Sequence, residues 1–202
     1  LVDFRLGDIR DFLAVSDAVR DVDVVIHAAS LKYVDISEQQ PSEYVMTNTV
    51  GTMNLIAAVL AEKNIRRCVG ISSDKACRPV NTYGLTKALL EKLFLEAAKR
   101  KGERIKTIFN VARYGNVVGT RGSVVPFWQQ CRREGKPLPI TDPQMTRFFF
   151  TLDEAVDLLN FALECPEGVV VSKRMSAASL GDVAAVMQTN GVVKVGHRPG
   201  EK

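Results

Sequence analysis

The sequence alternates short apolar, β-branched segments with longer amphipathic ones. Residues 23–29, 67–72 and 105–111 have the length and composition of strands. Residues 41–63 and 82–101, which lie between them, repeat apolar side chains at helical spacing. Strands and helices in this order predict right-handed βαβ units and a doubly wound parallel sheet, which is an α/β fold.

The first thirty residues extend this pattern. Residues 23–29 are almost continuously apolar, which predicts a strand buried on both faces. Residues 1–6 are predicted as a strand and residues 11–20 as a short helix. Because the chain begins directly in an apolar segment without an initiator methionine, we expect it to be part of a longer protein.

After Arg113 the pattern becomes less regular. A glycine-rich loop is followed by predicted helices at 126–135 and 151–164. Short strands are predicted near 169–171 and 192–195, with a helix between them. We therefore expect a dinucleotide-binding core over residues 1–120 and a smaller mixed α/β substrate lobe over residues 121–202, interleaved with the core.

Composition excludes several classes of function. The net charge of +4 is spread along the chain, and no apolar run reaches the roughly 18 residues of a membrane-spanning helix. Neither nucleic acid nor a membrane is therefore expected as a partner. The four cysteines are widely spaced and form no Cys-x-x-Cys pair, so we expect no metal site and a reducing cytoplasm.

Tyr83 and Lys87 begin the strongest predicted helix, four residues apart, and therefore share one helical face. An ammonium beside a phenol favours the phenolate, which can take a proton from an alcohol while hydride leaves the carbon. Such a pair also occurs on ordinary helices by chance. Its position near the end of a predicted buried strand favours the catalytic interpretation.

Asp74 and Lys75 follow the predicted strand 67–72, and they stand at its carboxyl end. Ligands of doubly wound sheets bind in the crevice at that edge. An adjacent acid and base there can act on neighbouring atoms of one substrate. The alternative, a solvated charge pair in a loop, is less favoured next to the Tyr83–Lys87 motif.

Two further strand ends carry candidate ligand contacts. Ala28 and Ala29 are small enough for a flat cofactor to approach the backbone, and Asp8 can face an adenine amino group. His27 is interpreted as a structural histidine. The glycine-rich loop 113–123 offers backbone donors to an anion. The guanidinium groups of Arg147 and Arg198 suit phosphate contacts.

These motifs together resemble a known family. The chain resembles the extended short-chain dehydrogenase/reductases, and among them the polysaccharide-biosynthesis nucleotide-sugar dehydratases. The resemblance lies in the runs 72–76 (Ser-Ser-Asp-Lys-Ala), 79–87, 112–126, 145–148 and 198–202. Within that group the chain most resembles the inverting UDP-N-acetylglucosamine 4,6-dehydratases, which open pseudaminic acid synthesis. The resemblance implies a Rossmann-like sheet.

The resemblance also implies a reaction. Tyr83, assisted by Lys87, would take the proton of the sugar 4-hydroxyl as hydride passes to the nicotinamide. Lys75 would then remove the proton at carbon 5, and Asp74 would protonate the departing 6-hydroxyl. Hydride returning to carbon 6 would give a 4-keto-6-deoxy sugar, with carbon 5 inverted in some members.

By the same resemblance, other residues would hold the two ligands. Contacts to the cofactor, NADP in preference to NAD, are expected from Asp8, Ile9, Ala28, Ala29, Ser72, Tyr83, Lys87 and Asn116. Contacts to the UDP-sugar are expected from Lys32, Asn116, Val124, Arg147 and Arg198. Family members usually assemble, so we expect a homo-oligomer.

The sequence departs from the family in lacking the glycine-rich dinucleotide fingerprint, so an N-terminal βαβ unit is apparently missing. Two alternative functions remain. A UDP-sugar 4-epimerase shares the Tyr83–Lys87 motif but needs no second acid–base pair. A non-catalytic dinucleotide-binding regulator would have no reason to keep all four of Asp74, Lys75, Tyr83 and Lys87.

Overall fold

The computed structural model describes residues 2–120, 122–187, 191–196 and 199–201, and it divides into two compact units. Unit 1 comprises Leu1–Arg113, Leu158–Ser172 and Gly200–Lys202. Unit 2 comprises Tyr114–Asp157 and Lys173–Pro199. The chain thus enters unit 2 at Tyr114, earlier than the expected boundary at residue 121, and returns twice to unit 1.

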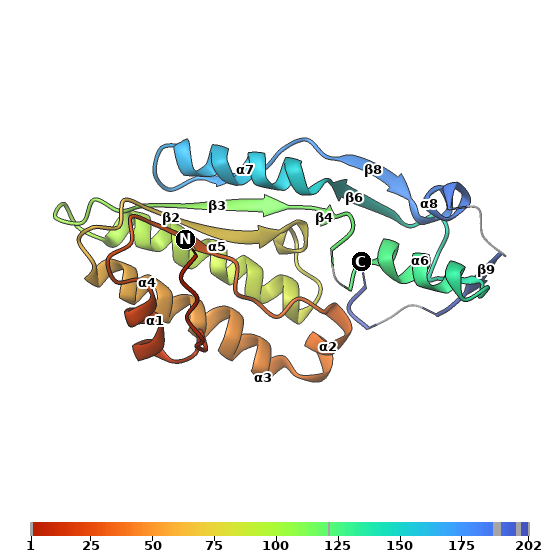
Figure 1. Cartoon of the computed structure of the whole chain (residues 1–202), viewed down its shortest axis with the longest axis horizontal. Coiled ribbons are helices and arrows are strands. Elements are labelled where there is room, and N and C mark those ends of the chain that lie inside the picture. The colour runs from red at the N-terminus through yellow and green to blue at the C-terminus, as the bar shows by residue number, and fades with distance from the viewer. Residues whose placement is uncertain (1, 121, 188–190, 197–198, 202) are drawn as a thin grey trace. The chain divides into compact units, whose positions relative to one another are not determined.

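Unit 1 is built on a four-stranded sheet in the order β1-β2-β3-β7 (Figure 1). The strands are β1 (Val24–His27), β2 (Arg67–Ser73), β3 (Ile108–Tyr114) and β7 (Val170–Val171). β1 is parallel to β2, and β3 is parallel to β7. The predicted Rossmann-like α/β fold with a parallel sheet is therefore confirmed.

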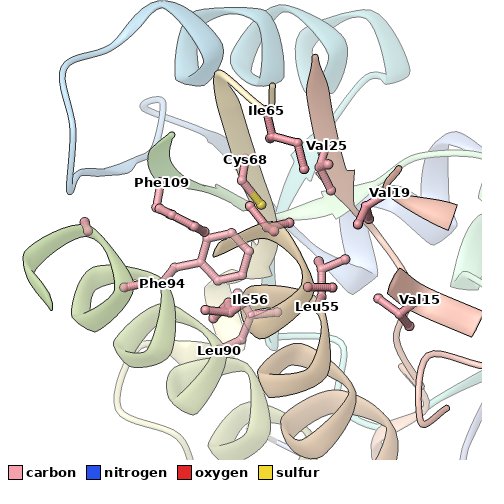
Figure 2. Close-up of a cluster of buried hydrophobic side chains, with 14 of the residues drawn as sticks. Val15, Val19, Val25, Leu55, Ile56, Ile65, Cys68, Leu90, Phe94 and Phe109 are labelled. Atoms are coloured by element: carbon pink, nitrogen blue, oxygen red, sulfur yellow. The ribbon is translucent and has the colours of Figure 1, made fainter. Parts of the chain in front are cut away.

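The helices of unit 1 agree with those predicted at residues 11–20, 41–63 and 82–101, and a short helix at Val34–Gln39 was not predicted. They are α1 (Phe12–Ala18), α2 (Val34–Gln39), α3 (Pro41–Tyr44), the π-helical η1 (Val45–Val50), α4 (Gly51–Ala61) and α5 (Thr82–Arg100). Figure 2 shows side chains of α1, α4 and α5 converging on those of β1, β2 and β3. Phe94 at the centre is fully buried and meets Phe109 edge-on. This core fixes α5, and hence its first turn, against β2.

The helical stretch Pro41–Ala61 is long and apolar enough to cross a membrane by length and composition. Leu55, Ile56 and Val59 of this stretch are buried in the core of unit 1. A core helix of a globular domain passes the same test of length and apolarity.

Two predictions about the first thirty residues are wrong. Residues 2–7 form no strand in the described chain, and Val2, Phe4 and Leu6 are exposed. The sheet order ends at β1, so no neighbouring strand pairs with this segment. β1 itself buries alternate residues, because Val24 and Ile26 remain about half exposed.

Unit 2 contains a three-stranded sheet and a separate strand pair. β4 (Asn116–Val117), β6 (Thr146–Phe150) and β8 (Ser176–Ser179) form the sheet, and β5 (Leu138–Ile140) pairs with β9 (Val192–Lys194). The helices α6 (Val124–Arg133) and α8 (Leu180–Val186) pack around the buried Trp128, whose Nε1 donates to the Pro139 carbonyl. A last helix, α7 (Leu152–Glu164), runs from unit 2 into unit 1.

Candidate active site

The predicted acid–base pair lies on a short 3-10 turn, η2 (Asp74–Ala76), directly after β2. Ser73 orders this turn, because its Oγ accepts from the Lys75 amide at 3.3 Å and donates to Asp74 Oδ1 at 3.0 Å. Lys75 Nζ lies 3.1 Å from the same carboxylate oxygen. Both side chains are partly exposed, so a substrate can reach them.

Tyr83 and Lys87 occupy the buried side of the first turns of α5. The helix begins after Asn81, whose Oδ1 accepts from the Gly84 amide at 2.7 Å in an N-cap. Lys87 is only 3% exposed, and its Nζ donates to the Ile71 carbonyl at 2.8 Å. The ammonium is therefore tied to β2 three residues before Asp74.

Burial sets the protonation of this pair. It raises the pKa of Tyr83 to about 12, against the opposing effect of a hydrogen bond with the Ser73 side chain. Burial also lowers the pKa of Lys87 to about 8, against the attraction of Glu91. In this structure the Lys87 ammonium donates to the Ile71 carbonyl, and desolvation dominates the pKa of Tyr83. That Lys87 favours the phenolate during the reaction stays a prediction. Tyr83 is a neutral phenol at neutral pH.

The structure brings all four predicted catalytic residues together in unit 1. Ser73 connects them, because it hydrogen-bonds both Asp74 and Tyr83. Gly84 allows the close approach, since a Cβ atom at this position would overlap the Lys75 carbonyl oxygen. No separate role was predicted for Ser73 or Gly84, although both stand inside the motifs.

We expect Gly84→Ala to lower the free energy of unfolding by about 1–3 kcal/mol, because the new methyl group must push α5 away from the η2 turn. Urea denaturation measures this loss. Lys92→Ala, at an exposed position on the same helix, is the matched control and should change stability much less. Equal stability of Gly84→Ala and the wild type would contradict the close packing.

The residues predicted to hold the cofactor have different surroundings. Ala28 and Ala29 follow β1 and are exposed, which leaves the backbone there open to a ligand. Ile9 packs against the core beside Gly51. The Asp8 carboxylate is bound by Arg10 through both oxygens, which lowers its pKa to about 2. The Ser72 hydroxyl is buried and donates to Glu91 at 2.6 Å.

The residues predicted to hold the substrate are divided between the units. Lys32 in unit 1 is exposed, with its Nζ over the Tyr33 ring. In unit 2, Asn116 Nδ2 donates to the Phe148 carbonyl at 2.8 Å, Val124 begins α6, and Arg147 is half-buried on β6. Arg198 lies outside the described residues. Within the described ranges, no group of three or more metal-ligating side chains is placed to hold a metal ion.

His27, at the end of β1, is a hydrogen-bonded core residue. Its Nε2 lies 2.9 Å from Thr52 Oγ1, and its ring stacks parallel to Phe94. Burial, aided by the positive charge of Lys87, lowers its pKa to about 4. The ring is therefore neutral in the folded protein at neutral pH.

This histidine should make folding pH-dependent. Between pH 6.5 and about 4, His27 is protonated in the unfolded chain but stays neutral in the folded chain. The free energy of unfolding therefore falls as the pH falls through this window. The expected loss is up to about 3 kcal/mol. Urea denaturation at both ends of the window measures it, and His27→Gln should remove this share of the dependence. An unchanged dependence in His27→Gln would refute the assignment.

The profile of the family described as "Polysaccharide biosynthesis protein" matches residues 2–202. The chain belongs to this polysaccharide biosynthesis family. The family resemblance inferred from the motifs is therefore confirmed.

Two curated relatives of this polysaccharide biosynthesis protein carry different names. A UDP-N-acetylglucosamine 4,6-dehydratase (inverting) of Campylobacter jejuni is 45% identical over 98% of the chain. A UDP-glucose 4-epimerase of Rickettsia bellii is 39% identical over 100% of the chain. The chain spans 60% of the length of each of these relatives.

Solved structures of related proteins share the fold. The X-ray structure of Pen from Bacillus thuringiensis superposes with a TM-score of 0.93 at 36% identity, over 99% of the chain and 65% of Pen. UDP-glucuronic acid 4-epimerase from Bacillus cereus, in complex with UDP-glucuronic acid and NAD, gives a TM-score of 0.82 at 25% identity, over 95% of the chain and 68% of the epimerase.

Proposed function

We propose that this polysaccharide biosynthesis protein dehydrates a UDP-amino sugar, UDP-N-acetylglucosamine, to a 4-keto-6-deoxy sugar. One observation carries the proposal: the Asp74–Lys75 pair lies beside Tyr83, joined to it through Ser73. An acid and a base in addition to the tyrosine are what an elimination needs. The Campylobacter jejuni relative supports the substrate and the inversion at carbon 5.

The residues present fit a nicotinamide cofactor. The small, exposed Ala28 and Ala29 leave room at the end of β1. Tyr83 and Lys87 are an acid–base pair of the kind that accompanies hydride transfer from an alcohol. When bound, the oxidised nicotinamide would accept and return hydride, and it would bring a positive charge to the site. We propose NADP, which the family resemblance favours, with NAD as the alternative supported by the Bacillus cereus complex. Equilibrium binding of each to the full-length protein distinguishes the two.

The residues divide the reaction into two halves. Tyr83 must act as its phenolate, which the Lys87 ammonium and the positive charge of a bound oxidised nicotinamide would favour, and the phenolate then accepts the proton of the 4-hydroxyl. The resulting ketone acidifies the proton at carbon 5, which Lys75 removes. Asp74 donates its proton to the 6-hydroxyl, which leaves as water. The elimination therefore starts with Lys75 as a neutral amine and Asp74 as a protonated acid. This state differs from the ion pair by the transfer of one proton from Lys75 to Asp74.

The second candidate is a UDP-sugar 4-epimerase, which the Rickettsia bellii relative supports. An epimerase uses Tyr83 and Lys87 and leaves Asp74 and Lys75 without a role. Because these two side chains are ordered by Ser73 and open to a substrate, the dehydratase is favoured. The same intact quartet speaks against a non-catalytic dinucleotide-binding regulator.

Incubation of the full-length protein with UDP-N-acetylglucosamine in deuterated water tests the proposal. A dehydratase gives a 4-keto-6-deoxy product that carries deuterium at carbon 5, and its configuration reports inversion. An equilibrium mixture of 4-epimers without deuterium would replace the proposal with the epimerase. Bound cofactor with no product from any UDP-sugar would favour the regulator.

We also propose a homo-oligomer. Met46 on η1, Met53 on α4, and Leu85 and Leu89 on α5 are each exposed, and η1 and α4 both pack against α5. Apolar side chains gathered on one surface favour association. Sedimentation of the full-length protein measures its oligomeric state. The double variant Met53→Glu, Leu89→Glu should shift the protein toward the monomer. A monomeric wild type would contradict the proposal.

A cytoplasmic location completes the proposal, with neither a membrane nor nucleic acid as partner. None of Cys68, Cys77, Cys131 and Cys165 forms a disulfide, which agrees with a reducing compartment. Cell fractionation with detection of the full-length protein tests the location, and recovery in the membrane fraction would contradict it.

A further inference from the structure

We infer that Glu91 and Arg113 are positioning residues that hold the Asp74–Lys75 turn in place for the elimination half of the reaction. Neither is among the residues predicted to touch a ligand. The inference rests on the proposed function, and it names residues that act on this site by holding the catalytic side chains in position. It is carried by a network of hydrogen bonds in unit 1 that centres on the buried Glu91 carboxylate and reaches the partly exposed Arg113.

Glu91 is the centre of this network. It lies on α5 one turn beyond Lys87 and is only 7% exposed. Its Oε1 accepts from Ser72 Oγ at 2.6 Å and from Arg113 Nε at 2.9 Å, and its Oε2 accepts from Arg113 Nη2 at 2.6 Å. The two-pronged contact with a guanidinium fixes the carboxylate in one orientation.

Arg113 extends the network to the far end of the turn. Its Nη1 donates to Cys77 Sγ at 3.0 Å. Ser72 stands two residues before Asp74, and Cys77 stands two residues after Lys75. The Glu91–Arg113 pair therefore contacts side chains on both sides of the acid and the base.

Stability alone does not explain such a pair. Burying a carboxylate and a guanidinium costs desolvation free energy, and apolar residues of similar volume often hold a fold equally well. The pair does something that apolar residues would not do. It fixes two hydrogen-bonding atoms, Ser72 Oγ and Cys77 Sγ, relative to α5, which carries Tyr83.

The division of the reaction makes this role testable. Oxidation at carbon 4 uses Tyr83 and Lys87, and elimination uses Asp74 and Lys75. If the pair positions the turn, weakening it slows elimination more than oxidation, because α5 is held independently by the core. A displaced acid or base loses roughly a hundredfold in rate for a shift of about 1 Å.

The experiment compares Glu91→Gln and Cys77→Ala with wild type in the full-length protein. Glu91→Gln keeps an acceptor for Ser72 but loses the charge that holds Arg113. Cys77→Ala removes the contact at the end of the turn from an exposed position, so it should fold even if Glu91→Gln does not. Glu96→Gln is the matched control, because Glu96 is an exposed α5 carboxylate paired with Arg100.

After rapid mixing with UDP-N-acetylglucosamine, reduced nicotinamide is followed by its absorbance, and deuterium at carbon 5 and keto sugar are followed in quenched samples. We expect Glu91→Gln to accumulate reduced nicotinamide, with keto-sugar formation about 10- to 100-fold slower. Its KM should change little. Cys77→Ala should show the same uncoupling to a smaller degree, and Glu96→Gln should match wild type.

Two results would overturn the inference. One is a parallel loss of oxidation and elimination in both variants, which indicates a general structural role. The other is wild-type behaviour of a folded Glu91→Gln, or of Cys77→Ala if Glu91→Gln does not fold. If the wild-type protein makes no keto sugar, this result would contradict the proposed function, and the inference would fall with it. The wild-type measurement therefore separates the two failures.

Discussion

Lys75→Ala is expected to abolish keto-sugar formation, with a loss of roughly 10²–10⁴-fold in kcat. In the proposed reaction the Lys75 amine is the base at carbon 5, and the Asp74 carboxyl, whose Oδ1 lies 3.1 Å from Lys75 Nζ, serves as the acid and does not replace it. Oxidation at carbon 4 does not use this amine, so the variant should still reduce bound nicotinamide and should bind cofactor normally. Quenched-flow analysis of the sugar with absorbance of the cofactor measures both.

The control for this variant is Lys92→Ala, which removes an exposed lysine from α5. It should retain wild-type kcat. Keto sugar formed by Lys75→Ala at the wild-type rate would end the assignment of Lys75 as the base.

Tyr83→Phe should block oxidation at carbon 4 and, with it, the elimination that follows. In the proposed reaction the Tyr83 phenolate takes the 4-hydroxyl proton, so we expect a loss of roughly 10²–10⁴-fold with no build-up of reduced nicotinamide. Since phenylalanine keeps the ring, the buried packing at the start of α5 should survive. Single-turnover measurement of the cofactor absorbance checks the result.

Tyr114→Phe in unit 2 is the matched control, because Tyr114 is also a hydrogen-bonded phenol, donating to the Ala155 carbonyl. Reduced nicotinamide appearing in Tyr83→Phe at the wild-type rate would show that another group takes the proton. Lys75→Ala and Tyr83→Phe together locate the two halves of the reaction. An epimerase would be blocked by Tyr83→Phe but would retain its activity in Lys75→Ala.

Periodicity predicted the long elements of unit 1 because burial dominates there. The helix at 82–101 and the strand at 67–72 were found within one residue at each end. The short strands β4, β5, β6 and β8 were missed, since two to five residues carry too little periodic signal. The strand predicted at residues 1–6 failed for another reason. A strand exists only with a partner, which local sequence does not reveal.

The candidate site shows the same division between local and distant information. Asp74, Lys75, Tyr83 and Lys87 were found from local spacing at a strand end and a helix start. Glu91 and Arg113 were missed, because their contact joins α5 to β3 across 22 residues and leaves no local pattern. The raised pKa of Tyr83 could not be predicted for a related reason, since spacing places Tyr83 near Lys87 on the helix but does not give its burial.

The contact of Gly84 with the η2 turn has a consequence for how such a protein changes during evolution. Backbone meets backbone there, so the spacing between Tyr83 and the Asp74–Lys75 pair does not depend on which side chains occupy positions 74 and 75. Exchange of those two side chains therefore leaves the oxidising half in place. A lineage can gain or lose elimination by point substitution, and a designer can begin from the same two positions without rebuilding a loop.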